Sequence, residues 1–344
     1  TVRLNPYVEL LRQGLRQAAP DVEPARFSRL SLGWCLRERR VYDIIHIHWG
    51  ELQYEAGSTA GRWRRFASFT AALAAAKLAG SKLVYTVHNL AQHEGRHGRL
   101  NGWTNRLLYA WSDALHVHDK SAAGAVAARV GEEERLFIIP HGNYCGYYPN
   151  EIGREEARQR LGLEPSDFVY LALGGLRPYK GIEELIDAFA GLEGEEARLV
   201  IAGHAHAPAY AREISARAAG DPRIVTYLEH VSDAAVQVYM NAADVCVFPY
   251  RQVTTSGAAI LALSFGRPIV APAIGPFPAL AAETAGIVYD PTASDGLRGA
   301  LEAARRADLA AGRQAIVDDL RATDWVQVGR QHAAMYRRIV GRAE

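Results

Sequence analysis

The stretch Phe168-Val-Tyr-Leu-Ala-Leu-Gly-Gly-Leu-Arg-Pro-Tyr-Lys-Gly-Ile-Glu-Glu-Leu-Ile-Asp-Ala-Phe189 places an apolar strand before a glycine-rich turn and a helix. The first six residues are continuously apolar, and apolar residues from Ile182 onward recur at the spacing of one helix face. The turn contains Gly174, Gly175, Arg177, Lys180 and Gly181. Glycines let the backbone approach a ligand closely, and the two cations can hold an anion. The stretch predicts a phosphate-binding turn in an α/β protein; an ordinary strand–helix connection with solvated cations is the alternative.

Size and composition indicate two domains without a strong overall charge. The chain has 344 residues, whereas single domains usually have about 100–200. Its 39 basic and 38 acidic residues leave a net charge of +1, so no global field favours nucleic acid. The cysteines, Cys35, Cys145 and Cys246, are few and far apart, which argues against a disulfide framework. With no leader pattern and no apolar run of membrane-spanning length, we expect a cytoplasmic protein.

Strand and helix patterns alternate along both halves of the chain. In the first half, strands are expected at 41–48, 83–88, 114–118 and 136–140, with helices at 7–18, 63–79, 103–112 and 121–130. In the second half, strands are expected at 168–173, 198–202, 224–228, 244–248 and 268–271, with helices at 182–190, 208–218, 233–242 and 257–265. Such alternation predicts parallel βαβ units whose ligands bind beyond the carboxyl ends of the strands.

These patterns predict two doubly wound, Rossmann-like domains that face each other across a cleft. A polar segment around 150–162 separates the halves, which gives an N-terminal domain of residues 1–150 and a C-terminal domain of residues 151–324. Apolar residues near the end of the chain follow a helical pattern. Residues 325–344 are therefore expected to pack back on the N-terminal domain as a helix.

A second candidate for phosphate binding follows the strand at 244–248. Thr254, Thr255 and Ser256 stand where a helix N-cap belongs, and Gly257 opens a helix of small residues. Free amides at such a helix start suit a diphosphate, although a plain N-cap is the alternative. Together with the turn at Lys180, this segment predicts a clamp on one nucleotide diphosphate.

Taken together, the motifs resemble those of retaining nucleotide-sugar glycosyltransferases with the GT-B fold, particularly family four. The resembling motifs are Lys180-Gly181, Ala202-Gly203, Ala243-Asp244 with Pro249, the segment 266–271 (GRPIVA), Thr86-Val87-His88 and the segment 139–143 (IPHGN). The resemblance implies a hexosyltransferase that uses no metal or other cofactor and retains the anomeric configuration. Its donor is a nucleotide diphosphate sugar. Its acceptor is a hydroxyl of a saccharide, a lipid-linked saccharide or a natural product.

By this resemblance, the second domain binds the donor and the first binds the acceptor. Donor contacts are expected from Gly174, Gly175, Arg177, Lys180, Gly203, Thr255, Ser256 and Gly257. Acceptor contacts are expected from His48, Glu51, Asn89 and His93, and catalytic contributions from His88, Arg177, Lys180 and Glu94. In a retaining reaction His88 orients the sugar, while the two cations stabilise charge on the departing diphosphate. In an inverting reaction, Glu94, Glu51 or His88 is the candidate base.

The chain departs from the family pattern at three positions. The usual pair of glutamates with seven residues between them falls on Val253 and Leu261, and the usual arginine falls on Gly175, with Arg177 two residues later. Diphosphate binding is compatible with these changes, but ribose and sugar recognition must differ. A Thr-Ser-Gly loop in place of the first glutamate also occurs in bacterial polysaccharide glycosyltransferases, so we interpret the departure as a subfamily trait.

Two further patterns have a functional and a structural interpretation. His46 and His48 share one strand face near Glu51, but a zinc site formed by these three residues would also need a ligand from a loop. We therefore expect ordinary strand-end histidines and no metal. Basic and aromatic residues alternate at 62–66 (RWRRF). This segment is favoured as a solvated helix end, with peripheral contact to the inner face of a membrane as the alternative.

Two other functions remain open on the sequence alone. A sugar-nucleotide epimerase shares the two-domain shape but needs acid and base carboxylates and no acceptor. A non-catalytic sugar-nucleotide-binding protein is compatible with the missing glutamate pair. Release of nucleoside diphosphate in the presence of an acceptor separates the transferase from both.

Overall fold

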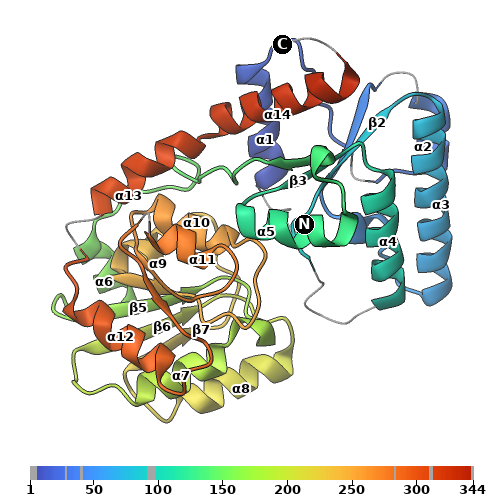
Figure 1. Cartoon of the computed structure of the whole chain (residues 1–344). Helices are drawn as coiled ribbons and strands as arrows, with labels where there is room; N and C mark the ends of the chain where they lie inside the picture. Colours follow the sequence, from blue (N-terminus) through green and yellow to red (C-terminus); the bar gives the residue numbers. More distant parts are fainter. Residues whose placement is uncertain are drawn as a thin grey trace. The chain divides into compact units, whose positions relative to one another are not determined.

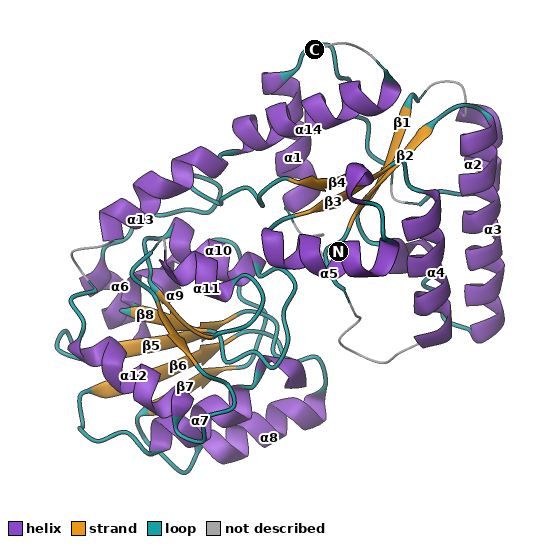
Figure 2. Ribbon diagram, viewed as in Figure 1, coloured by secondary structure: helices purple, strands orange, loops and turns teal. Residues whose placement is uncertain are grey.

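The computed structural model describes residues 6–27, 29–38, 42–90, 98–282, 284–309 and 313–341. Contacts divide the chain into two compact units: residues 1–142 with 325–344, and residues 143–324. Each unit contains a parallel sheet flanked by helices (Figures 1 and 2). The expected α/β architecture of two Rossmann-like domains is confirmed. Among the described residues, no helix is both long and apolar enough to cross a bilayer.

Unit 1 is built on a four-stranded parallel sheet of order β1-β2-β3-β4. Its strands are β1 (Ile44–Ile47), β2 (Lys82–Thr86), β3 (Ala114–Val117) and β4 (Leu136–Ile138). Its helices are α1 (Tyr7–Ala18), α2 (Leu32–Glu38), α3 (Thr59–Leu78), α4 (Gly98–Trp111), α5 (Lys120–Val130) and α14 (Trp325–Val340), with short 3-10 turns η1 (Gly50–Gln53) and η2 (Glu133–Arg135). The helix starts are specified locally: Ser58 accepts from the Gly61 amide and Asp119 accepts from the Ala122 amide.

Helix α14 is separated from the rest of unit 1 by the whole of unit 2 in the sequence, yet it packs tightly on α1. The two helices meet at glycines: a Cβ on Gly329 would lie 2.4 Å from the backbone carbon of Gly14. A Cβ on Gly14 would lie 1.8 Å from the Trp325 carbonyl oxygen. Neither position has room for a side chain, so the close helix pair depends on both glycines.

Unit 2 is built on a six-stranded parallel sheet of order β10-β9-β8-β5-β6-β7. Its strands are β5 (Phe168–Leu173), β6 (Ala197–Ala202), β7 (Ile224–Tyr227), β8 (Val245–Val247), β9 (Ile269–Pro272) and β10 (Ile287–Tyr289). Its helices are α6 (Arg154–Leu161), α7 (Ile182–Ala190), α8 (Pro208–Ala218), α9 (Val236–Ala242), α10 (Gly257–Ser264), α11 (Phe277–Ala282), α12 (Gly296–Arg306) and α13 (Arg313–Asp319), with η3 (Pro178–Lys180) and η4 (Leu320–Thr323). The strand order reverses between β5 and β8, which is where a doubly wound sheet offers its ligand crevice.

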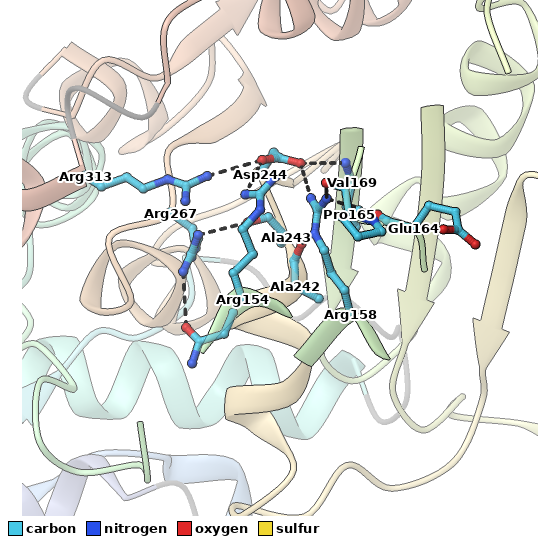
Figure 3. Close-up of polar contacts among 11 residues, drawn as sticks. Arg154, Arg158, Glu164, Pro165, Val169, Ala242, Ala243, Asp244, Arg267 and Arg313 are labelled. Atoms are coloured by element: carbon cyan, nitrogen blue, oxygen red, sulfur yellow. Dashed lines mark hydrogen bonds and ion pairs between the residues drawn. The ribbon is translucent and has the colours of Figure 1, made fainter. Parts of the chain in front are cut away.

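Asp244 anchors the amino end of β8 (Figure 3). Its carboxylate pairs with Arg158 at 2.8 Å, Arg154 at 2.6 Å and Arg313 at 3.3 Å, and it accepts the Val169 amide at 2.8 Å. Asp244 is 6% exposed and Arg158 is 1% exposed. One carboxylate therefore joins α6, α13, β5 and β8 at the amino ends of the central strands, opposite the ligand crevice.

The nine expected strands are present in the described part of the chain, with small shifts at their ends. The sequence reading missed β10 because this edge strand has only three residues, and Val288 at its centre is 42% exposed. It also missed α12, where the alternation of arginines and alanines hides the buried face formed by Ala300, Leu301 and Ala304.

Candidate functional site

The glycine-rich turn after β5 is held against the end of β6 by backbone contact. Gly174 and Gly203 have φ angles of +131° and +140°, which side-chain-bearing residues rarely adopt. A Cβ on Gly203 would lie 2.0 Å from the Gly174 carbonyl oxygen. Beyond them, the Leu176 amide donates to the His204 carbonyl at 2.9 Å. The two strand ends are thus brought together by glycines that the sequence singled out for ligand contact.

The following turn is fixed to the loop after β8. Gly181 has a φ of +66°, and a Cβ at this residue would lie 2.1 Å from the Pro249 carbonyl oxygen. The Arg251 amide donates to the Tyr179 carbonyl at 2.9 Å. The turn therefore spans the gap between β5 and β8, where the strand order reverses.

Lys180 occupies the centre of this arrangement. Its Nζ lies 5.2 Å from the ring centre of Tyr250, a cation–π distance, and both side chains line a small pocket with Gly174, Leu176 and Phe248. Burial lowers the pKa of Lys180; the nearby Tyr179 raises it and Arg177 lowers it. No carboxylate among the described residues lies within ion-pair distance of Lys180. A half-buried cation without a protein counter-charge is best satisfied by an anionic ligand.

The second phosphate candidate begins helix α10. Ser256 caps the helix, because its Oγ accepts the Ala259 amide at 3.2 Å, and Gly257 is the first helical residue. Thr254 is buried, and the buried Thr255 hydroxyl has no hydrogen-bond partner among the described residues. Burial raises the pKa of Tyr250, and a hydrogen bond with Ser256 opposes that rise. Tyr250 therefore connects the Lys180 turn with the start of α10.

The positions where family members carry glutamates are apolar and partly packed. Val253 and Leu261 are half-buried against the core of unit 2. A Cβ on Gly275 would lie 2.8 Å from the Val253 carbonyl oxygen, so this loop also contacts the segment after β9. The remaining donor-site predictions, Gly175 and Arg177, lie in the turn itself, where Gly175 is exposed and Arg177 half-buried.

Unit 1 contains a cluster of seven histidines at the carboxyl ends of its strands and on α14. They are His46, His48, His88, His116, His118, His141 and His332. Tyr7 packs edge-on against four of these rings, and Trp49 stacks on His88 with ring centres 4.5 Å apart. The sequence predicted His48 and His88 at a site and included His141 in a motif that resembles the family pattern, but it did not single out Trp49.

One row of hydrogen bonds crosses this cluster from α14 to the residue that follows β4. The Ile139 carbonyl can only accept, so His116 Nε2 donates to it at 2.9 Å. His116 Nδ1 then accepts from Thr86 at 2.9 Å, and Thr86 accepts from His46 Nε2 at 2.7 Å. His46 Nδ1 accepts from Tyr336 at 2.7 Å. When both histidines are neutral, every group in this row has a hydrogen-bond partner.

A second row ends on the same carbonyl. His118 Nδ1 donates to Ile139 at 3.3 Å, so its Nε2 accepts from His88 Nδ1 at 3.4 Å. His88 Nε2 in turn accepts from His48 Nδ1 at 3.4 Å. This sequence of donors leaves Nε2 of the neutral His48 as the acceptor at the open end of the row. His48 and His88 therefore act as one hydrogen-bonded unit.

Burial keeps these histidines neutral. It lowers the pKa of every member, to about 3 for His48 and to about 4 for His141 and His332. Protonated neighbours within the cluster would lower the pKa values further. At neutral pH the cluster therefore offers hydrogen-bond donors and acceptors rather than positive charge.

The other acceptor-side predictions are placed as follows. Glu51 lies in η1, where burial raises the pKa of its carboxyl group. Asn89 is half-buried, one residue after His88. His93 and Glu94 lie outside the described residues. Within the described ranges, no group of three or more histidine, cysteine, aspartate or glutamate side chains is arranged to hold a metal ion.

Comparison with known proteins finds similarity to glycosyltransferases. Residues 167–305 match the family model described as glycosyl transferases group 1. The chain is 29% identical over 345 residues to the GDP-mannose:glycolipid 4-beta-D-mannosyltransferase of Xanthomonas campestris pv. campestris, covering 98% of this chain and 89% of that protein. It is 29% identical over 300 residues to the D-inositol 3-phosphate glycosyltransferase of Xylanimonas cellulosilytica, covering 80% and 67%.

Solved structures agree on the fold. The crystal structure of Anabaena Alr3699/HepE in complex with UDP matches with a TM-score of 0.70 at 19% identity, covering 88% of this chain and 80% of that chain. With the family match and the parallel sheets, these similarities identify a GT-B glycosyltransferase. The chain is a hexosyltransferase whose sequence and fold are similar to those of family 4-like GT-B glycosyltransferases.

Proposed function

We propose that the chain transfers a hexose from a nucleotide diphosphate sugar, bound by unit 2, to a hydroxyl of a saccharide or lipid-linked saccharide. The observation that carries this proposal is the position of Lys180. Lys180 is half-buried, its ammonium group lies beside the Tyr250 ring between the ends of β5 and β8, and no described carboxylate neutralises it. A diphosphate supplies the missing negative charge at the crevice where doubly wound sheets bind nucleotides.

The two neighbouring elements support the same ligand. Arg177 is three residues from Lys180 and adds a second cation, while the free amides at the start of α10 favour an anion. In the reaction, negative charge grows on the diphosphate as it leaves. Lys180 and Arg177 stabilise that charge in a site partly screened from water, and this is where we expect their largest contribution. We propose that these cations, rather than a metal ion, neutralise the leaving group.

GDP-mannose and a glycolipid are the first donor and acceptor to test. The relative from Xanthomonas is named for both, and its alignment covers nearly the whole of this chain. The half-buried apolar residues at Val253 and Leu261 replace the carboxylates of the family pattern, so sugar and ribose contacts must come from other groups.

The stereochemical course separates two mechanisms. With retention, His88 orients the sugar and no protein base is needed. With inversion, a base must take the proton of the acceptor hydroxyl, and Glu51, His88 or Glu94 is the candidate. Transfer from an α-linked nucleotide mannose to a β-mannoside would be an inversion. The anomeric configuration of the product, measured by NMR, decides between the two courses.

A thermal-shift titration with UDP-, GDP-, ADP- and dTDP-sugars tests the donor site without an acceptor. A bound donor raises the melting temperature in proportion to the logarithm of its concentration over Kd. We expect a shift with at least one donor, its loss in Lys180→Ala and partial recovery in Lys180→Arg. Lys120→Ala, at an exposed lysine of α5, is the matched control. An unchanged shift and unchanged turnover in Lys180→Ala would contradict the assignment of Lys180 to the donor site.

A further inference from the structure

Two exposed tryptophans meet on the surface of unit 1. Trp63 lies in the second turn of α3 and is 42% exposed, and Trp103 lies in the second turn of α4 and is 53% exposed. Their ring centres are 6.0 Å apart in an edge-to-face arrangement. The two helices are drawn next to each other in Figure 2. Within the 62–66 segment, Phe66 is half-buried whereas Trp63 is exposed.

Exposed arginines accompany the tryptophans on both helices. Arg64 is exposed on α3, while Arg99, Trp103 and Arg106 follow the i, i+4, i+7 spacing that places them on one side of α4, and all three are exposed. No described carboxylate pairs with Arg64, Arg99 or Arg106. We call the surface formed by Trp63, Arg64, Arg99, Trp103 and Arg106 the tryptophan–arginine face.

The charge of these helices has one sign. Neither α3 nor α4 contains an aspartate or glutamate, whereas the whole chain is almost balanced between acidic and basic residues. Their basic residues are Arg62, Arg64, Arg65, Lys77, Arg99 and Arg106. Lys77, toward the other end of α3, pairs with Asp113. The unpaired positive charge is therefore concentrated around the two tryptophans.

The face is supported from beneath. Tyr54 donates a hydrogen bond to Asn101 of α4 and packs edge-on against Phe66 of α3. Arg62 donates to the Ala56 carbonyl at 3.1 Å, which holds the start of α3 in place. The tryptophans are consequently presented by ordered helix ends, which lowers the entropy cost of binding a flat surface.

We propose that the tryptophan–arginine face binds the surface of an anionic lipid bilayer. Indole rings prefer the boundary between headgroups and acyl chains, and arginines around them attract anionic headgroups. Neither helix contains an acidic residue that would repel anionic headgroups, which favours this partner. This inference concerns a different surface from the donor site and does not depend on which sugar is transferred.

Co-sedimentation with vesicles tests the proposal with neither donor nor acceptor present. The full chain is mixed with vesicles of phosphatidylcholine alone or with phosphatidylglycerol added, at low and high ionic strength. We expect binding to the anionic vesicles and its weakening by salt. The triple variant Arg64→Glu/Arg99→Glu/Arg106→Glu should bind at least about 100-fold more weakly, because each basic residue near an anionic surface contributes several-fold. Trp63→Ser/Trp103→Ser should also lose binding.

The control carries the same change of charge on unit 2, in Arg160→Glu/Arg212→Glu/Arg306→Glu. Circular dichroism and the melting temperature establish that each variant is folded. Failure of the wild-type protein to bind anionic vesicles overturns the proposal. So does a loss of binding in the control equal to that in the triple variant of the tryptophan–arginine face. Absence of vesicle binding together with a dimer that dissociates in the double tryptophan variant would assign this face to a second copy of the chain.

Discussion

Tyr336 on α14 donates a 2.7 Å hydrogen bond to His46 Nδ1 on β1, across 290 residues of sequence. It is the first donor of a row that continues through Thr86 and His116 to the Ile139 carbonyl. The bond connects the last helix of the chain with the first strand of the sheet in unit 1. The histidine cluster is therefore completed from the C-terminal end of the chain.

Removing that hydroxyl should destabilise unit 1. Tyr336→Phe leaves His46 Nδ1 without a donor, and an unsatisfied buried acceptor costs about 1–3 kcal/mol of unfolding free energy. Urea denaturation followed by circular dichroism measures the change. Tyr147→Phe, at an exposed tyrosine, is the matched control and should leave the midpoint unchanged. Equal midpoints for Tyr336→Phe and the wild type would show that the row contributes nothing to stability.

Acid should destabilise unit 1 before unit 2. Burial lowers the pKa of His332 to about 4 in the folded chain, whereas an unfolded histidine has a pKa of about 6.5. The unfolded state binds more protons between these values, so stability falls as pH decreases from about 6.5 to about 4. Each such histidine contributes about 1.4 kcal/mol of loss per pH unit in this window.

Urea midpoints at pH 7.5 and 5.5 measure this acid dependence. For each protein, the drop is the difference between its own urea midpoints at pH 7.5 and pH 5.5. This drop should be smaller in His332→Gln than in the wild type, because one titrating group is gone. His204→Gln is the control, since His204 is exposed in unit 2. The same drop in His332→Gln as in the wild type would contradict the assignment of acid sensitivity to the cluster.

A side chain at Gly203 should disturb the donor site. Its φ of +140° strains any other residue, and a Cβ would overlap the Gly174 carbonyl at 2.0 Å. Strain of this kind costs about 1–3 kcal/mol before the overlap is counted. In Gly203→Ala we expect a lower melting temperature and weaker donor binding in the thermal-shift titration. Gly220→Ala should behave like the wild type, because its nearest contact is the Arg217 carbonyl at 3.5 Å.

Loss of the Asp244 carboxylate should unfold unit 2 more readily. Asp244→Asn leaves the guanidinium group of Arg158 buried without its counter-charge, and breaking a buried pair costs about 3–5 kcal/mol. Denaturant unfolding measures the effect. Asp187→Asn, which breaks the exposed pair with Arg217, is the control and should cost at most about 1 kcal/mol. Similar losses in both variants would contradict the central role of Asp244.

Local patterns predicted the elements well where they are long or strongly apolar. The strand at Phe168–Leu173 and the helix at Ile182–Ala190 have the expected ends, because both the buried strand and the apolar helix face are continuous in the sequence. β10 was missed because three residues at a sheet edge, with an exposed centre, produce no such pattern. Its place is set by pairing with β9, which is a tertiary contact.

The candidate site residues likewise fall into those with a local sequence signal and those whose position depends on tertiary contacts. Lys180 was predicted as a site residue because a cation within a glycine turn is a local signal. Tyr250 was not singled out, since its position beneath the ammonium group depends on β8 lying next to β5. The pairing of Trp63 with Trp103 was likewise invisible, because two helices separated by a strand bring the rings together. His332 lies on α14, and nothing near it in the sequence relates it to His116.

The discontinuity of unit 1 has a consequence for dissecting the protein. A fragment cut after residue 142 would lack α14, leaving the α1 face that packs on it uncovered and His46 without Tyr336. An isolated unit 1 should therefore be made as a circular permutant, with residues 325–341 fused ahead of α1 through a flexible linker. In that design the chain order would follow the order in space.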